Sequence, residues 1–156
     1  MKRIIMINCV DYQQRTALAE QLMTMLPQPV TYDGFWGCNT TADMYGQKVD
    51  QLAFGNMTHA ISCFIEAGTF DTIVISWAQP ESVFISIAEA IKPDAFGLFY
   101  FDINDWPLHG ASTFPSVSYR HLFDVFDGQL VKSFRCGLAS VSPAAAADRV
   151  VRLLNS

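Results

Sequence analysis

Charged residues are scarce in this chain of 156 residues. They make up 16% of the sequence, whereas soluble proteins carry about 25%. Together with 51% hydrophobic residues, this scarcity excludes a disordered, collagen-like or low-complexity chain. The ten Lys and Arg residues are spread along the chain and the net charge is −5, so the sequence has no basic stripe to neutralise phosphates. We therefore expect no nucleic-acid partner.

Long apolar runs are lacking as well. No run approaches the roughly 18 residues that a membrane-spanning helix needs. The apolar run near the start covers only residues 4–7, which is too short for a signal peptide. The sequence therefore predicts a cytoplasmic protein without a membrane partner.

Closely spaced cysteines are also missing. The four cysteines stand at positions 9, 38, 63 and 136, and none belongs to a CxxC motif. A chain of this length needs no disulfide framework to support its core. The sequence therefore predicts neither a zinc site nor CxxC redox chemistry.

Short apolar runs alternate with amphipathic stretches along the whole chain. The apolar runs predict five strands, at residues 3–8, 30–32, 70–77, 95–101 and 130–134. The amphipathic stretches predict helices at residues 16–26, 41–67, 80–91 and 143–154. This alternation predicts a single α/β domain over residues 1–156, in which helices cover both faces of a five-stranded parallel sheet. Ligands of such three-layer folds bind beyond the carboxyl ends of the strands.

The segment after the first predicted strand carries the most informative motif. Aligned with the pattern GxxxxGK[ST], Cys9 takes the first glycine, Gln14 the second, Arg15 the lysine and Thr16 the hydroxyl residue. In spacing and flanks the segment resembles the phosphate-binding loop of the P-loop small-molecule and nucleotide kinases. The resemblance implies a P-loop NTPase fold of the nucleotide-kinase type.

Later features follow in the order typical of that family. The turn Asp33-Gly34 resembles its acidic substrate-site turn, and Gly68 ends a long helix before the third strand. Asp102 ends an apolar run in the manner of a Walker B strand. Arg120 is the nearest candidate for a lid arginine, a residue type that such kinases bring to the transferred phosphate.

The resemblance also implies roles for individual residues if the protein is active. ATP and Mg²⁺ would be the cofactors, and a small molecule or nucleotide would be the ligand. Arg15 would clamp a phosphate, Thr16 and Asp102 would hold Mg²⁺, and Asp33 would orient or deprotonate an acceptor hydroxyl. Residues of the loop would contact the nucleotide: Cys9, Gln13, Gln14, Arg15 and Thr16.

Glycine is absent from this loop, because the first glycine of the chain is Gly34. Consecutive backbone N–H groups wrap a phosphate only where the backbone can adopt positive φ. Lys and Arg are also absent between Asp102 and Ser118, where a lid would lie. These departures predict weak or no binding of Mg-ATP and argue against efficient phosphoryl transfer. Without a phosphate, we expect Arg15 to turn toward the carboxylate of Asp33 or Asp102.

Two other interpretations stay open. The same scaffold could serve as a non-catalytic binding or interaction module, that is, a pseudoenzyme. The spacing from Cys9 to Arg15 also fits the signature of cysteine-dependent phosphatases, although the chain lacks the Asp-Pro pair that supplies their acid. In addition, low charge with twelve Phe and three Trp predicts an apolar patch that is shared in a homodimer.

Overall fold

The computed structural model describes residues 2–34, 47–79, 81–91, 93–104, 129–138 and 140–156, with the backbone alone at 47–52. The strands are β1 (Lys2–Asn8), β2 (Pro29–Asp33), β3 (Thr72–Ser76), β4 (Phe96–Asp102) and β5 (Val131–Arg135). The helices are α1 (Tyr12–Met25), α2 (Gln47–Ala67), α3 (Glu81–Ile91) and α5 (Pro143–Leu154). Within the described ranges, every helix is too short or too polar to cross a membrane.

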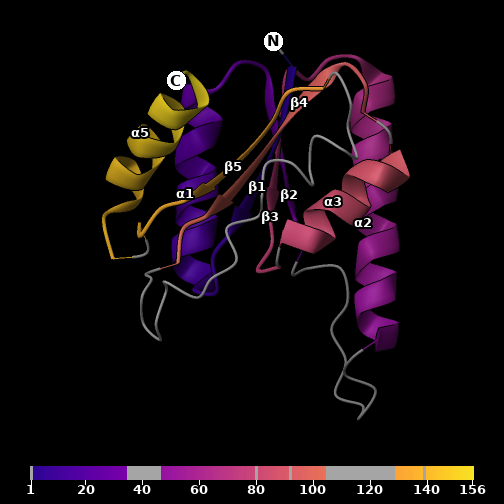
Figure 1. The fold of residues 1–156 in the computed structure, drawn as a ribbon, viewed down its shortest axis with the longest axis horizontal. Coiled ribbons are helices and arrows are strands. Elements are labelled where there is room, and N and C mark those ends of the chain that lie inside the picture. Colours follow the sequence, from indigo (N-terminus) through magenta and orange to yellow (C-terminus); the bar gives the residue numbers. More distant parts are fainter. Residues whose placement is uncertain (1, 35–46, 80, 92, 105–128, 139) are drawn as a thin grey trace.

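All five strands run parallel in one sheet, in the order β2-β3-β1-β4-β5 (Figure 1). The central strand β1 pairs with β3 through Ile5 and Val74, and with β4 through Ile5 and Phe99. Helices α2 and α3 cover one face of the sheet, while α1 and α5 cover the other (Figure 1). The predicted three-layer α/β fold is therefore confirmed. Because β1 is central, the residues after Asn8 lie in the middle of the carboxyl edge of the sheet.

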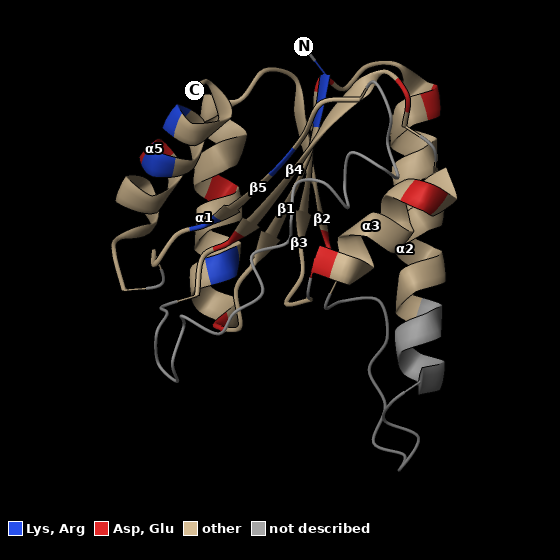
Figure 2. Ribbon diagram, viewed as in Figure 1, with Lys and Arg blue, Asp and Glu red and all other residues tan. Residues whose placement is uncertain are grey.

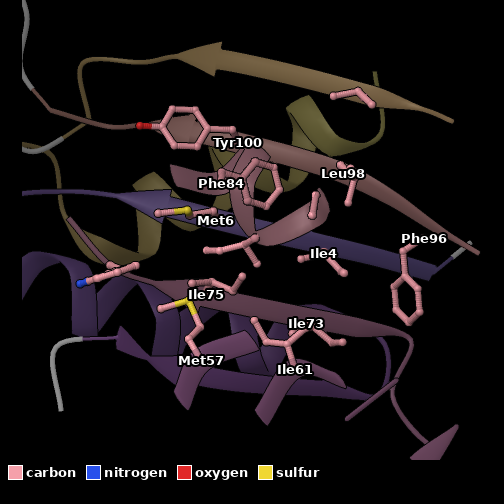
Figure 3. Packing of buried hydrophobic residues seen from close by; sticks show 14 of the residues in the cluster. Ile4, Met6, Met57, Ile61, Ile73, Ile75, Phe84, Phe96, Leu98 and Tyr100 are labelled. Carbon is pink, nitrogen blue, oxygen red and sulfur yellow. The ribbon is translucent and has the colours of Figure 1, made fainter. Parts of the chain in front are cut away.

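Side-chain alternation along each strand builds one core on either face of the sheet. Toward α2 and α3, Met57, Ile61 and Phe84 pack on side chains of β1, β3 and β4 (Figure 3). Toward α1 and α5, Leu18 and Val150 pack on the alternate residues of the same strands. The strands are apolar on both faces for this reason, which is why their sequences are continuous apolar runs.

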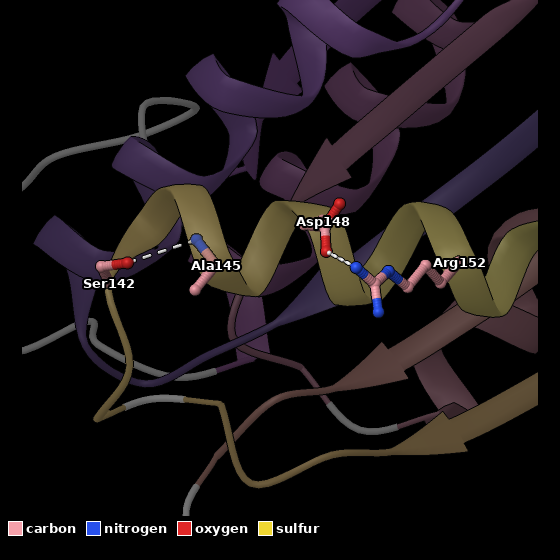
Figure 4. A network of polar contacts seen from close by, with 4 residues as sticks. All are labelled: Ser142, Ala145, Asp148 and Arg152. Carbon is pink, nitrogen blue, oxygen red and sulfur yellow. Dashed lines mark hydrogen bonds and ion pairs between the residues drawn. The ribbon is translucent and has the colours of Figure 1, made fainter.

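The last helix begins where the sequence predicts. The hydroxyl of Ser142 accepts a hydrogen bond from the backbone N of Ala145 at 3.2 Å, and Pro143 occupies the first turn (Figure 4). One turn further on, Asp148 and Arg152 form an ion pair at 2.9 Å (Figure 4). Such an exposed pair adds little stability, so the cap and the apolar face fix the helix.

Glycine is required at position 68 by the backbone conformation and at position 34 by the lack of space for a side chain. Gly68 ends α2 with φ +70°, which confirms the predicted C-terminal cap. Gly34 follows β2 against the ring of Trp77, where an added Cβ would lie 2.5 Å from Cγ of Trp77 and 2.7 Å from Cε of Met57. The missing side chain at Gly34 therefore lets Trp77 close the core at the end of β2. For the helix predicted at 41–67, residues 41–46 lie outside the described residues.

Candidate functional site

The connection between β1 and α1 is short. Helix α1 begins at Tyr12, so the prediction that it begins at Thr16 is wrong by one helical turn. Asp11 is the N-cap, and its Oδ1 accepts a hydrogen bond from the backbone N of Gln14 at 3.2 Å. Only residues 9–11 link strand and helix, and Tyr12 to Arg15 form the first helical turn rather than a loop.

The backbone N–H groups of Val10, Gln14 and Arg15 all donate within the protein. The N–H of Val10 donates to Oδ1 of Asn104 at 2.9 Å, and that of Arg15 donates to the carbonyl of Asp11 at 3.0 Å. Asn104 is 7% exposed, and its side-chain amide donates to Oδ1 of Asp102 at 2.9 Å. Asp102 and Asn104 thus tie the end of β4 to the connection after β1.

Arg15 points into the protein. Its side chain is 2% exposed, and Nη1 donates to the carbonyl of Cys9 at 2.6 Å. The guanidinium carbon lies 5.3 Å from the ring centre of Tyr12. The expected partner was a carboxylate of Asp33 or Asp102, whereas the observed acceptor is a backbone carbonyl. Arg15 lies in the first turn of α1. Its inward-facing guanidinium therefore packs against the connection between β1 and α1 that precedes this helix.

The thiol of Cys9 is buried. Cys9 is 0% exposed, and its Sγ donates to the carbonyl of Asp11 at 3.5 Å. Burial is the main cause that raises the pKa of this thiol, and it outweighs the hydrogen bond with the Asp11 backbone, which lowers the pKa. The nearby Arg15 lowers the pKa but does not outweigh burial. A neutral, buried thiol is a poor nucleophile.

The other predicted loop residues lie on α1 and point in different directions. Gln13 is exposed, whereas the amide of Gln14 donates to the carbonyls of Leu138 and Val141 at 3.2 and 2.9 Å. Gln14 therefore anchors α1 to the segment that leads into α5. The hydroxyl oxygen of Thr16 is buried and has no hydrogen-bond partner. The predicted lid residue Arg120 lies outside the described residues.

The two predicted acidic residues end different strands. Asp33 ends β2 and is aligned with Ser76 of β3, while Asp102 ends β4 and is aligned with Asn8 of β1. Asp102 is 3% exposed. In the part of the chain that the structure describes, no three His, Cys, Asp or Glu side chains are grouped to hold a metal ion. Magnesium binding by Thr16 and Asp102 thus stays a prediction.

A polar network closes the α3 side of the same edge. The amide of Asn8 donates to the hydroxyl of Tyr100 at 2.8 Å, and that hydroxyl donates to the carbonyl of Gln79 at 2.9 Å. Burial raises the pKa of the Tyr100 hydroxyl, so it stays protonated. The hydroxyl of Ser133 donates to the carboxylate of Glu81 at 2.9 Å. These bonds tie the beginning of α3 to β1, β4 and β5.

Charge on the two faces of the sheet is uneven (Figure 2). The described side chains of α2 and all those of α3 include Glu66, Glu81 and Glu89 but no Lys or Arg. On α1, the one basic residue is the buried Arg15. The described helices that border the carboxyl edge therefore offer few cations to a polyphosphate.

Comparison with solved structures identifies the architecture. A de novo designed protein with the P-loop NTPase fold matches with a TM-score of 0.53 and 13% identity, over 99% of this chain and 91% of that chain. This chain has the P-loop NTPase fold. No family model matches the sequence, and no curated protein matches it.

Natural proteins with this P-loop NTPase fold include kinases. The tunicamycin resistance protein of Deinococcus radiodurans matches with a TM-score of 0.58 and 12% identity, over 99% of this chain and 96% of that chain. The APS kinase of Mycobacterium tuberculosis, solved in complex with AMPPNP and APS, matches with a TM-score of 0.53 and 13% identity, over 99% and 98%. The scaffold is therefore kinase-like, while identities this low carry no information on the reaction.

The sequence patterns did not predict the capping role of Asp11 or the contact of Asn104 with Val10. Asp11 stands three residues before Gln14, which is the spacing of a capping box and would have placed the helix start correctly. Asn104 carries no such signal, because its partner Val10 lies 94 residues away in the chain. Only the pairing of β1 with β4 brings the two residues together.

Proposed function

We propose that this protein is a non-catalytic, kinase-like binding module that does not hold nucleotide phosphates at the connection between β1 and α1. The observation that carries the proposal is the carboxylate of Asp11, which caps the N-terminus of α1. In a P-loop NTPase, an anionic phosphate takes the position before the first helix. Here the protein supplies its own anion.

Electrostatics and geometry both support this proposal. Two unit negative charges 4 Å apart repel by about 1 kcal/mol in water and about 4 kcal/mol near a protein surface. The N–H groups of Val10 and Gln14 already have acceptors, which a phosphate would have to displace. Arg15 would have to leave its buried bond with Cys9 to reach a ligand. The residues present therefore do not fit a triphosphate.

The phosphatase alternative finds no support in the surroundings of Cys9. A phosphatase nucleophile must be an exposed thiolate, whereas burial keeps the thiol of Cys9 neutral. We assign Cys9 a packing role, with its carbonyl as the anchor for Arg15.

The ligand of the module is proposed to be a small molecule held at the carboxyl edge. Asp33 is half-buried at the end of β2 and stays the proposed contact for a hydroxyl group of that ligand. The homodimer predicted from composition also stays a proposal.

Thermal unfolding tests the proposal directly. We would measure the midpoint of the protein and of Asp11→Ala, each with Mg-ATP, Mg²⁺ alone or sodium sulfate. Glu20→Ala is the matched control, because Glu20 is an exposed acid on α1 beyond the first turn. A ligand that binds only the native state raises the midpoint.

We expect millimolar Mg-ATP to leave the midpoint of the unchanged protein where Mg²⁺ alone leaves it. Sulfate should stabilise Asp11→Ala more than the unchanged protein or Glu20→Ala, because the helix N-terminus is then open to an external anion. Saturable stabilisation of the unchanged protein by micromolar Mg-ATP would overturn the proposal.

A further inference from the structure

Cys63 has a histidine, His59, beside it on α2. Neither residue belongs to the candidate site at the carboxyl edge of the sheet. His59 and Cys63 lie one turn apart on α2, and both side chains are exposed. Nε2 of His59 lies 3.8 Å from Sγ of Cys63. When the ring carries its proton on Nδ1, Nε2 is an acceptor for the thiol proton. A nucleophile and a base thus face solvent together.

The other described cysteines are shielded. Cys9 is fully buried, and burial raises its pKa. Cys136 is half-buried, and burial raises its pKa from 9.0 to about 11. Both thiols are protonated and poorly accessible at neutral pH. Cys63 differs from them because it is exposed and has His59 beside it.

We propose that Cys63 is a modification site for low-molecular-mass disulfides, with His59 as the base that activates it. The thiol proton passes to Nε2 of His59, and the thiolate attacks one sulfur of the disulfide. The S–S bond of the reagent breaks, a mixed disulfide forms on Cys63, and the second sulfur leaves as a thiolate that takes up a proton. The disulfide is the oxidant, so no further redox partner is needed.

Exposure alone does not account for such reactivity. Cys63 lies four residues before Ala67, where α2 ends, and Glu66 follows within the last turn. The contribution of His59 to the reaction of Cys63 is measurable by substitution.

The experiment follows each cysteine separately. The reduced protein is mixed with oxidised glutathione, quenched with acid, digested and analysed by mass spectrometry, which gives a rate for every cysteine-containing peptide. His59→Gln removes the base but keeps a polar side chain of similar reach. Asn56→Ala is the matched control, because Asn56 is exposed on α2 about one turn before His59. Added imidazole supplies an external base.

We expect Cys63 to react at least about tenfold faster than Cys9 or Cys136 in the folded protein. His59→Gln should slow Cys63 at least about threefold, imidazole should restore part of the rate, and Asn56→Ala should change nothing. The rates of Cys9 and Cys136 serve as an internal check of folding, and His59→Asn repeats the test if they rise. An unchanged rate of Cys63 in the histidine variants, or a rate no faster than that of Cys136, would overturn the proposal.

Discussion

Replacement of Asp11 by alanine probes the feature that distinguishes this connection from a phosphate cradle. The carboxylate accepts the hydrogen bond from the backbone N of Gln14 and stands at the positive end of α1. Loss of an N-cap costs about 1 kcal/mol, and loss of a negative charge at a helix N-terminus costs about 0.3–1 kcal/mol. We therefore expect Asp11→Ala to lower the free energy of unfolding by about 1.5 kcal/mol.

Equilibrium unfolding in urea, followed by circular dichroism, measures this change. Since 1 kcal/mol shifts the midpoint of a chain of this size by about 2–4 °C, Asp11→Ala should also melt about 4 °C lower. Asp11→Asn keeps an acceptor and loses only the charge, so it should recover most of the loss. Salt should narrow the difference between the Asp and Asn proteins, because it screens the charge.

The reasoning has a clear point of failure. Glu20→Ala removes an exposed charge from the same helix without touching its cap, and should leave stability unchanged to within about 0.5 kcal/mol. If Asp11→Ala were as stable as that control, the carboxylate would act neither as cap nor as anion. If Asp11→Asn were as unstable as Asp11→Ala, the charge alone would act, and the hydrogen bond would not cap the helix. The proposed self-capping of α1 would then be wrong.

Three other substitutions test neighbouring features. Asn104→Ala should cost about 1 kcal/mol in urea unfolding, because the N–H of Val10 loses its acceptor. Gly34→Ala should cost about 1–3 kcal/mol by the same assay, because its Cβ would meet the ring of Trp77. The unfolded chain ionises Cys136 first, so the free energy of unfolding should fall as pH rises from 9.0 to about 11, and Cys136→Ala should flatten that part of the pH profile.

The sequence was sufficient for the fold because the fold depends on regular patterns. Buried strands on both faces of a parallel sheet are continuous apolar runs, and each of the five runs is a strand in the structure. Helix ends with strong local signals were also predictable, as Gly68 and Ser142 show. In both cases the determinant lies within a few residues of the feature that it fixes.

The candidate site was less predictable because its contacts join distant parts of the chain. Without a phosphate, Arg15 was expected to face Asp33 or Asp102, while the structure turns it onto the carbonyl of Cys9. The motif spacing also placed the start of α1 too late, because it outweighed the nearer signal of Asp11 before Gln14. The bond from Val10 to Asn104 depends on the pairing of β1 with β4, which no local pattern contains.

The missing glycines and the early helix start have one physical cause. A phosphate-wrapping loop needs residues at positive φ, which cost non-glycine residues about 1–2 kcal/mol each. Without a glycine before Gly34, the segment gains more by continuing α1 toward its N-terminus, where Arg15 can bond to Asp11 through the backbone. The longer helix then has its N-terminus beside β1, and Asp11 supplies the negative charge that this end favours. In the proposed function, the early helix start and the carboxylate of Asp11 both act against phosphate binding at this point.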